Sequence, residues 1–215
     1  MKPTMQLPPR QTTGSVRWAR AAGLVYLTAS VGFLTVFSWR AAAFGYPDVL
    51  DRSAADVLPA LLSLGGTGRL VWIVYALLPL MLIPAAVGTS EWLRDWDGVV
   101  PGAARLGLVL QVVAAVTMTV GLARWSTANW MLAEQWGNAD PAQRVVLTVM
   151  FDAFNAFFGN AIGELVGELA LYSSFLAFAV ALRARGAVRT AALGGLTGTV
   201  GLVGMLRNIT SVVQP

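Results

Sequence analysis

Five runs of mostly apolar residues, each about as long as a membrane-spanning helix, divide the chain and constrain its fold most strongly. They cover residues 18–39, 70–90, 103–124, 158–182 and 190–209. A helix needs about 20 apolar residues to cross roughly 30 Å of hydrocarbon. The chain is 56% hydrophobic and 12% charged, whereas soluble domains are about half apolar and a quarter charged. The sequence therefore predicts an all-α integral membrane protein, a helical bundle of five transmembrane helices in a lipid bilayer.

Two further intervals are apolar without forming separate spans. Residues 53–64 are too short to cross a bilayer and contain Pro59, so we expect a short interfacial helix there. Residues 143–157 fit a half-span, an interfacial helix or an extension of the fourth run, and the sequence leaves these alternatives open. Pro141 suits a first helical turn, and the third run can continue as a helix to about Glu134. Both helices would then project beyond the bilayer.

The domain organisation follows from the short polar intervals between the runs. A separate soluble domain needs at least ~50 residues, and no polar interval is that long. We expect a single membrane domain over residues 18–209, between an N-terminal tail of residues 1–17 and a C-terminal tail of residues 210–215. A secretory signal is the competing interpretation of the first run. That run is longer than the roughly 7–15 apolar residues of a signal, so we expect it to be retained.

The basic residues set the expected orientation. With a cytoplasmic N-terminus, nine of the 15 basic residues but only three of the 11 acidic ones lie at the inner ends of the runs. This bias follows the positive-inside rule and accounts for the basic charge without a nucleic-acid partner. High alanine, arginine and glycine usage indicates a bacterial source, so we expect a multi-pass protein of the inner (cytoplasmic) membrane. An outer aromatic belt is expected from Trp39, Trp72, Trp125, Trp130 and Trp136.

The absence of cysteine and histidine narrows the possible chemistry. It excludes disulfides, thiol nucleophiles and thiolate or imidazole metal sites. We expect no cofactor and no metal, and any proton chemistry would fall to carboxylates. No nucleophile motif or phosphate-binding loop is present, so an enzyme is not favoured. A hydrolytic pair, or an ion site completed by another helix, at Glu164 and Glu168 stays open.

The most informative polar feature is an acidic stripe in the fourth run. Residues 151–172 read FDAFNAFFGNAIGELVGELALY. An ionisable group near the bilayer centre costs on the order of 2.5 kcal/mol, so such groups are kept for a task or matched by partners. At ~1.5 Å per residue, Glu168, Arg124 and Arg207 reach a similar height toward the outer surface. Residues spaced by multiples of four lie on one helical face. Those that form the stripe are Asp152, Asn160, Glu164 and Glu168.

Two interpretations of this stripe compete, beside a third in which it faces lipid or another subunit. In one, the two glutamates only neutralise Arg124 and Arg207. In the other, they line a polar pocket, with Glu168 as its floor. Carboxylates beside tryptophan faces would suit a cation or an amphipathic amine. The expected ligand-binding residues are Glu164, Glu168, Asn160, Asp152, Arg207 and Asn208, with Arg124, and a lid of Trp125, Asn129 and Trp130.

Glycines on the fourth and fifth runs predict close helix packing. Gly159, Gly163 and Gly167 form a doubled GxxxG pattern, which allows another backbone to approach closely. The fifth run has small residues at similar spacing. We expect these two helices to pack on each other through Gly159, Gly163 and Gly167 on one side and Gly194, Gly198 and Gly201 on the other.

Two short motifs resemble those of a known family. RAAGLVYL at residues 20–27, and FFGN at 157–160 followed by GELALYSSFLAFAVALRARG at 167–186, resemble a family of small bacterial polytopic membrane proteins classed as a domain of unknown function. The resemblance implies a helical membrane fold over most of the chain. It implies no activity and no site residues.

Two functions are therefore expected to compete. The first is binding or translocating a small, cationic or amphipathic ligand through the polar pocket. The alternative is a structural or regulatory subunit that docks a partner membrane protein, or a second copy, through the glycine-rich helix faces.

Overall fold

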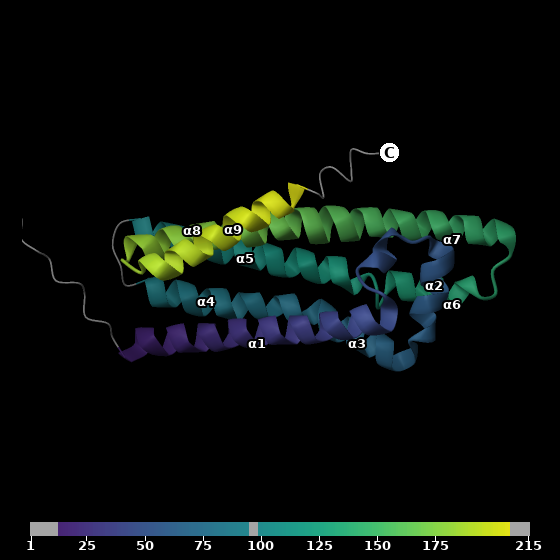
Figure 1. The fold of residues 1–215 in the computed structure, drawn as a ribbon, viewed down its shortest axis with the longest axis horizontal. Coiled ribbons are helices and arrows are strands. Elements are labelled where there is room, and N and C mark those ends of the chain that lie inside the picture. Colours follow the sequence, from purple (N-terminus) through teal and green to yellow (C-terminus); the bar gives the residue numbers. More distant parts are fainter. Residues whose placement is uncertain (1–12, 95–98, 207–215) are drawn as a thin grey trace, which may run out of the picture.

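The elements of the computed structural model are all helices in the residues that it describes, 13–94 and 99–206 (Figure 1). Two of the short segments, η1 and η2, are 3₁₀ helices, and η3 is a π-helix. In chain order the elements are α1 (Thr13–Phe44), η1 (Asp48–Asp51), α2 (Ala54–Ser63), α3 (Gly65–Leu77), η2 (Leu78–Met81), α4 (Leu82–Leu93), α5 (Val99–Ala123), α6 (Ala128–Trp136), α7 (Pro141–Phe154), η3 (Asn155–Val166), α8 (Gly167–Ala184) and α9 (Val188–Gly204).

Four helical stretches in the described residues are long and apolar enough to cross a membrane. They are Val16–Phe44, Gly65–Leu93, Val100–Trp136 and Pro141–Ala184. They contain the first four predicted spans, so the multi-pass, all-α class is confirmed. The fifth predicted span corresponds to α9, which has 17 residues, and residues 207–209 of that span lie outside the described part. The count of five spans stays a prediction.

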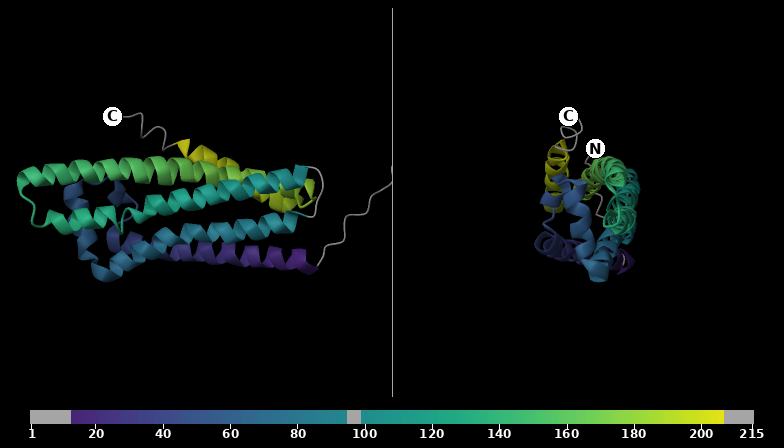
Figure 2. Two further views of the ribbon diagram at one scale, coloured as in Figure 1. Left: turned by 180° about the vertical axis from the view of Figure 1, so that it is seen from behind. Right: turned by 90° about the vertical axis from the view of Figure 1, so that its right-hand side faces the viewer.

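The long helices lie side by side in a bundle (Figure 2). Each packs on the next in the order α1, α4, α5, α8, α9. One end of this bundle, called the basic end below, collects the start of α1, the end of α4, the start of α5, and the turn from α8 to α9 (Figure 1). The arginines on these segments are Arg17, Arg20, Arg94, Arg105, Arg183, Arg185 and Arg189.

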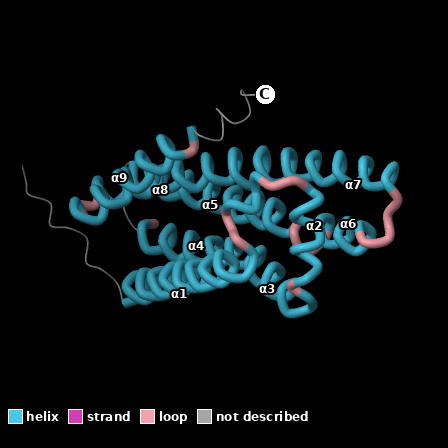
Figure 3. Tube along the Cα trace, turned by 45° about the vertical axis from the view of Figure 1, so that its right-hand side comes forward, coloured by secondary structure: helices cyan, strands magenta, loops and turns pink. Residues whose placement is uncertain are grey.

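At the opposite end, α6 and α7 extend past the bundle and α2 crosses between them and α3 (Figure 3). We call residues 45–64 and 128–154 the head. The stretch Pro141–Ala184 has 44 residues, or about 66 Å at ~1.5 Å per residue, which is about twice the hydrocarbon thickness. The open question about residues 143–157 is therefore answered, because they extend the fourth helix. The short helix predicted at residues 53–64 forms as α2, but its apolar face is buried in the head.

The start of α7 follows from its sequence. The Asp140 carboxylate accepts a hydrogen bond from the Gln143 backbone N–H at 2.8 Å, and the Gln143 side chain accepts one from the Asp140 backbone N–H at 2.9 Å. This reciprocal capping box satisfies two backbone donors. Pro141 occupies the first helical turn, where its missing N–H costs nothing.

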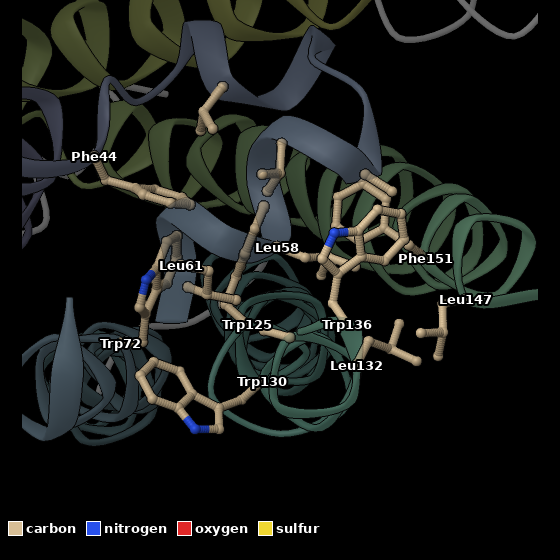
Figure 4. Close-up of a cluster of buried hydrophobic side chains, with 14 of the residues drawn as sticks. Phe44, Leu58, Leu61, Trp72, Trp125, Trp130, Leu132, Trp136, Leu147 and Phe151 are labelled. Atoms are coloured by element: carbon tan, nitrogen blue, oxygen red, sulfur yellow. The ribbon is translucent and has the colours of Figure 1, made fainter. Parts of the chain in front are cut away.

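An aromatic cluster packs the junction between the head and the bundle (Figure 4). The rings of Trp72 and Trp125 stack with centroids 4.8 Å apart, and Phe44 meets both of them edge-on at 5.8 Å. The expected outer aromatic belt is therefore wrong for most of its members, because burial against α2 outweighs an interfacial position. The buried tryptophans are Trp72, Trp125, Trp130 and Trp136.

The glycines of the fourth helix face α5 rather than α9, which corrects the expected pairing. A Cβ atom on Gly121 would lie 2.6 Å from the Cα atom of Gly163 and 2.9 Å from the carbonyl oxygen of Phe158. A Cβ atom on Gly159 would meet Arg124, and one on Gly167 would meet Met118. The backbones of α5 and η3 are therefore in direct contact, which only glycine permits.

The glycines of α9 pack on α8 instead. A Cβ atom on Gly194 would lie 3.6 Å from the Cβ atom of Ala179. One on Gly198 would lie 2.8 Å from the carbonyl oxygen of Tyr172, whose ring covers Gly201. Both glycine series are thus covered inside the bundle. The reason is that α9 is offset along α8 toward the basic end, so it meets side chains there and not η3.

Two Gly→Ala substitutions within α5 should have opposite effects on stability. Gly121→Ala should lower the free energy of unfolding by ~1–3 kcal/mol, because the new Cβ overpacks the contact with Gly163. Gly102→Ala is the matched control, since a Cβ atom there meets nothing within 4 Å. It should stabilise the helix by ~0.5–1 kcal/mol. Thermal unfolding of both variants in one detergent measures the difference, and equal losses would contradict the close approach.

Candidate functional site

A cavity of about 640 Å³ lies where the bundle meets the head. Its walls come from α1, the segment around η1, α3, α5 and the helix formed by η3 and α8. Among the residues predicted from sequence, the lining includes Arg124, Trp125, Asn160, Glu164 and Glu168, together with Gly159 and Gly163. The lining residues not predicted are Phe33, Phe37, Tyr46, Pro47, Asp48, Leu50, Tyr75, Met118, Gly121 and Leu122.

The π-helical form of η3 places much of one cavity wall. Its backbone makes wider turns with i→i+5 hydrogen bonds, and the Gly167 N–H accordingly donates to the carbonyl of Ile162. Asn160 and Glu164 lie on this segment and Glu168 follows it, and all three line the cavity. Asp152 does not, because it lies in the head with its side chain exposed to solvent. The stripe predicted from spacing is therefore shorter than expected.

Arg124 is buried and held by neutral oxygen atoms. Its Nε donates to Asn155 Oδ1 at 2.9 Å and its Nη1 donates to the Gly121 carbonyl at 2.5 Å. Because Gly159 has no side chain, the guanidinium fits against η3, where a Cβ atom would lie 2.6 Å from Cζ. Asn129 Nδ2 also donates to Asn155 Oδ1, at 3.2 Å. Asn155, absent from the predicted site, thus connects α5, α6 and the start of η3.

Carboxylates outnumber guanidinium groups around the cavity. Glu164 lies close enough to Arg124 for their charges to interact, but no described residue donates a hydrogen bond to its carboxylate. Asp48 adds an exposed carboxylate from η1, and Glu168 adds another from the start of α8. The hydrogen bonds of Arg124 go to neutral partners, so Glu164 interacts with it through charge and not through a described hydrogen bond. The interpretation in which the glutamates only neutralise arginines stays a prediction for Glu168. Arg207 and Asn208 lie outside the described residues.

The predicted lid is only partly present. Trp125 lines the cavity and stacks on Trp72. Asn129 and Trp130 are not among the lining residues, which corrects the expectation. Asn129 is fully buried beside Asn155, and Trp130 Nε1 donates to Glu134 at 2.9 Å inside the head. The turn between α5 and α6 redirects the chain after Trp125, and this change of direction was not visible in the sequence.

A second buried arginine lies directly behind two residues of the cavity wall. Arg40 is 0% exposed, and its Cζ lies 3.6 Å from the ring centroids of Tyr46 and Trp72 and 4.1 Å from that of Tyr75. None of its guanidinium nitrogens has a hydrogen-bond partner in the described part of the chain. The faces of three aromatic rings therefore take the place of the water molecules that would otherwise solvate the guanidinium. We term Arg40, Tyr46, Trp72 and Tyr75 the arginine cage.

The arginine cage was missed by sequence reasoning. In the sequence, Arg40 follows Trp39 at the outer end of the first span, where a basic residue is ordinary. Tyr46 and Tyr75 carried no signal, because their rings meet Arg40 only when η1 and α3 fold back against α1. Both tyrosines also line the cavity, so the cage supports part of its wall.

No protein-family model, curated protein or solved structure matches this chain. The resemblance to a family of bacterial membrane proteins therefore stays a prediction. Within the described residues, no group of three or more acidic side chains is placed to hold a metal ion. The chemistry of the site rests on its own carboxylates, guanidinium and aromatic faces.

Removing the shared acceptor of Arg124 and Asn129 should destabilise the protein. Asn155→Ala leaves both donors unsatisfied in a buried place, and each such loss costs ~1–3 kcal/mol. Asn138→Ala is the control, because Asn138 is exposed in the turn before α7. Denaturant unfolding in detergent should show a lower midpoint only for Asn155→Ala. An unchanged midpoint would mean that water replaces the lost acceptor.

The arginine cage predicts an unusual order of stability. Arg40→Met removes a buried charge and fills a similar volume, so the free energy of unfolding should be unchanged or rise by ~1–4 kcal/mol. Arg40→Lys keeps the charge but loses the flat group that stacks on the rings, and should cost about 3 kcal/mol. The same two changes at exposed Arg52 should stay within about 0.5 kcal/mol of wild type. Thermal unfolding would reject this account if Arg40→Lys were the more stable cage variant.

Proposed function

We propose that this chain is a bacterial inner-membrane protein that binds or translocates a small cationic or amphipathic ligand through the cavity between bundle and head. The single observation that carries this proposal is the cavity itself, whose lining includes three carboxylates, one guanidinium and several aromatic side chains. Concave, mostly apolar sites with a few converging polar groups are where proteins bind small molecules. The helices that build it are of membrane-spanning length.

The charge of the lining supports a cation. Glu164 has no hydrogen-bond donor among the described residues, and Asp48 lies exposed at the rim. Arg124 is the lining guanidinium, and its Nε and Nη1 already donate to protein oxygens. Aromatic faces such as Trp125 also attract positive charge. A ligand with an ammonium or other cationic group would compensate these carboxylates, whereas an anion would be repelled by them.

The basic end of the bundle supports the proposed orientation. Its arginines lie at the ends of five different helices, and the positive-inside rule places such an end in the cytoplasm. The N-terminus is then cytoplasmic, and the cavity and head lie toward the outer surface. A ligand would reach the cavity from outside or from the outer leaflet.

The alternative of a structural or regulatory subunit loses its expected docking surface, because the glycine faces are covered within the bundle. One other observation favours it. Val145, Val146 and Val149 of α7 are each more than half exposed on the head, about 50 Å from the basic end at ~1.5 Å per residue, which is beyond the hydrocarbon. An exposed apolar face in water is typical of protein contacts. A partner membrane protein or a second copy would use this face.

Tetraphenylphosphonium, an amphipathic cation, tests the proposal. The purified protein should bind it, and Glu164→Gln should weaken binding about tenfold, because losing one close charge costs about 1.4 kcal/mol or more. Glu91→Gln is the control, since Glu91 pairs with Arg94 at the basic end. Isothermal titration calorimetry in an uncharged detergent measures both. No binding by wild type, or equal affinity of wild type and Glu164→Gln, would reject the cation site.

A further inference from the structure

We infer that the cavity opens sideways to the membrane and takes a lipid-like amphiphile with an ammonium headgroup from the outer leaflet. This inference rests on the proposed function and names the ligand class of the same site. The shared chemistry is an ammonium group, which also occurs on soluble amines. An amphiphile differs from a soluble amine in its route of entry and in its acyl chain, which would lie on the apolar wall of the cavity.

The lateral opening follows from which helices pack against the two walls of the cavity. Phe33 and Phe37 of α1 line one side of the cavity, and Asn160 and Glu164 of η3 line the other. In the described residues, α1 packs mainly on α4, η2 and α3, while η3 packs mainly on α5, α7 and α8. The two walls therefore have no extensive packing contact with each other. Asn160 both lines the cavity and is exposed, so it lies at the mouth.

The surroundings of the mouth are those of a lipid-facing surface. Leu34, next to Phe33 on α1, is 63% exposed. Phe157, close to Asn160 in the sequence, is 58% exposed and lies at the headgroup level, about 39 Å along the helix from Arg183 at ~1.5 Å per residue. Exposed apolar side chains beside a cavity mouth are favourable in hydrocarbon and costly in water. These exposed apolar side chains would therefore contact an acyl chain favourably, whereas they offer no favourable contact to a polar, soluble ligand.

The height of the mouth matches a headgroup. At ~1.5 Å per residue, Glu168 lies about 22 Å and Asn160 about 34 Å along the helix from Arg183, so the lining crosses the far edge of a ~30 Å hydrocarbon layer. Asp48 is exposed at the rim on the head side. An amphiphile resting in the outer leaflet would thus present its polar group at the level of the carboxylates without leaving the membrane.

The lining is divided as an amphiphile requires. Phe33, Phe37, Met118 and Leu122 form an apolar part that would contact the chain, and the acidic side chains form a polar part. The Glu164 carboxylate lacks a protein donor among the described residues, so it is the acceptor that an ammonium group would satisfy. A partly buried, charged acceptor without a hydrogen-bond donor is unfavourable, and a bound ammonium would remove that cost.

Short-chain lipids separate headgroup from chain in the test. The purified full-length protein in maltoside detergent is titrated with dihexanoyl phosphatidylethanolamine, dihexanoyl phosphatidylglycerol and glycerophosphoethanolamine, which has the headgroup alone. We expect the first to bind at least about tenfold more tightly than either of the others, and Glu164→Gln to remove at least about tenfold of its affinity. Glu91→Gln, at the basic end, should bind like wild type.

The route of entry has its own test, because the chain contains no cysteine. Asn160→Cys labelled with a bulky maleimide should lose binding of the phosphatidylethanolamine, since Asn160 is at the mouth. Asp56→Cys with the same label is the control, because Asp56 is exposed on α2 in the head. Asn160 is exposed as well, so neither substitution disturbs a core.

The outcomes distinguish the inference from the proposed function. Equal binding of the two lipids would overturn ammonium recognition. Binding of tetraphenylphosphonium or of the headgroup alone, with no gain from the acyl chains, would overturn the lipid-like ligand but keep a cation site. Unaltered binding after labelling at residue 160 would overturn lateral entry. Absence of binding for tetraphenylphosphonium and for every lipid would overturn both.

Discussion

The contact between the backbones of α5 and η3 is the constraint on which the rest of the site depends. Gly121 and Gly163 have no side chains to separate the two helices, so Arg124 can reach Asn155 and the face of η3 next to it. The same approach sets Glu164 near that guanidinium. A larger residue at this crossing would push η3 away, and the carboxylate and the arginine would no longer share one cavity.

The two buried arginines offset the desolvation free energy of their charges in two different ways. Arg124 has hydrogen bonds to neutral oxygens, which lower the penalty without cancelling the charge. Arg40 instead has three aromatic faces and no acceptor, so it relies on the attraction between a cation and aromatic rings. Neither arginine forms a described salt bridge with a carboxylate of the cavity lining. The Glu164 carboxylate therefore has no hydrogen-bond donor among the described residues, which is why a cationic ligand fits.

Much of the fold could be predicted because it depends on local patterns. The first four spans and the capped start near Pro141 follow from apolar length and end signals within single segments. Helix does reach Trp136, but as a separate helix, α6, after a turn at residues 124–127 that the apolar pattern does not show. The site was only partly accessible. Asn160, Glu164 and Glu168 could be grouped from their spacing on one helix, but the same spacing also included Asp152, which lies in the head outside the cavity lining. Asn129 and Trp130 were grouped with them by height and also lie elsewhere in the head. Height along a helix does not say in which direction a side chain points.

The class of protein, the helical segments and the bias of basic residues toward one end can be inferred from residue order alone, because hydropathy and charge act on each segment separately. Three-dimensional packing sets which helix covers each glycine series, the enclosure of Arg40 by η1 and α3, and the separation of α1 and η3 around a cavity. These features depend on contacts between residues far apart in the chain. A helical period shows that a face exists, but the neighbour that covers it is chosen by the packing of the whole bundle.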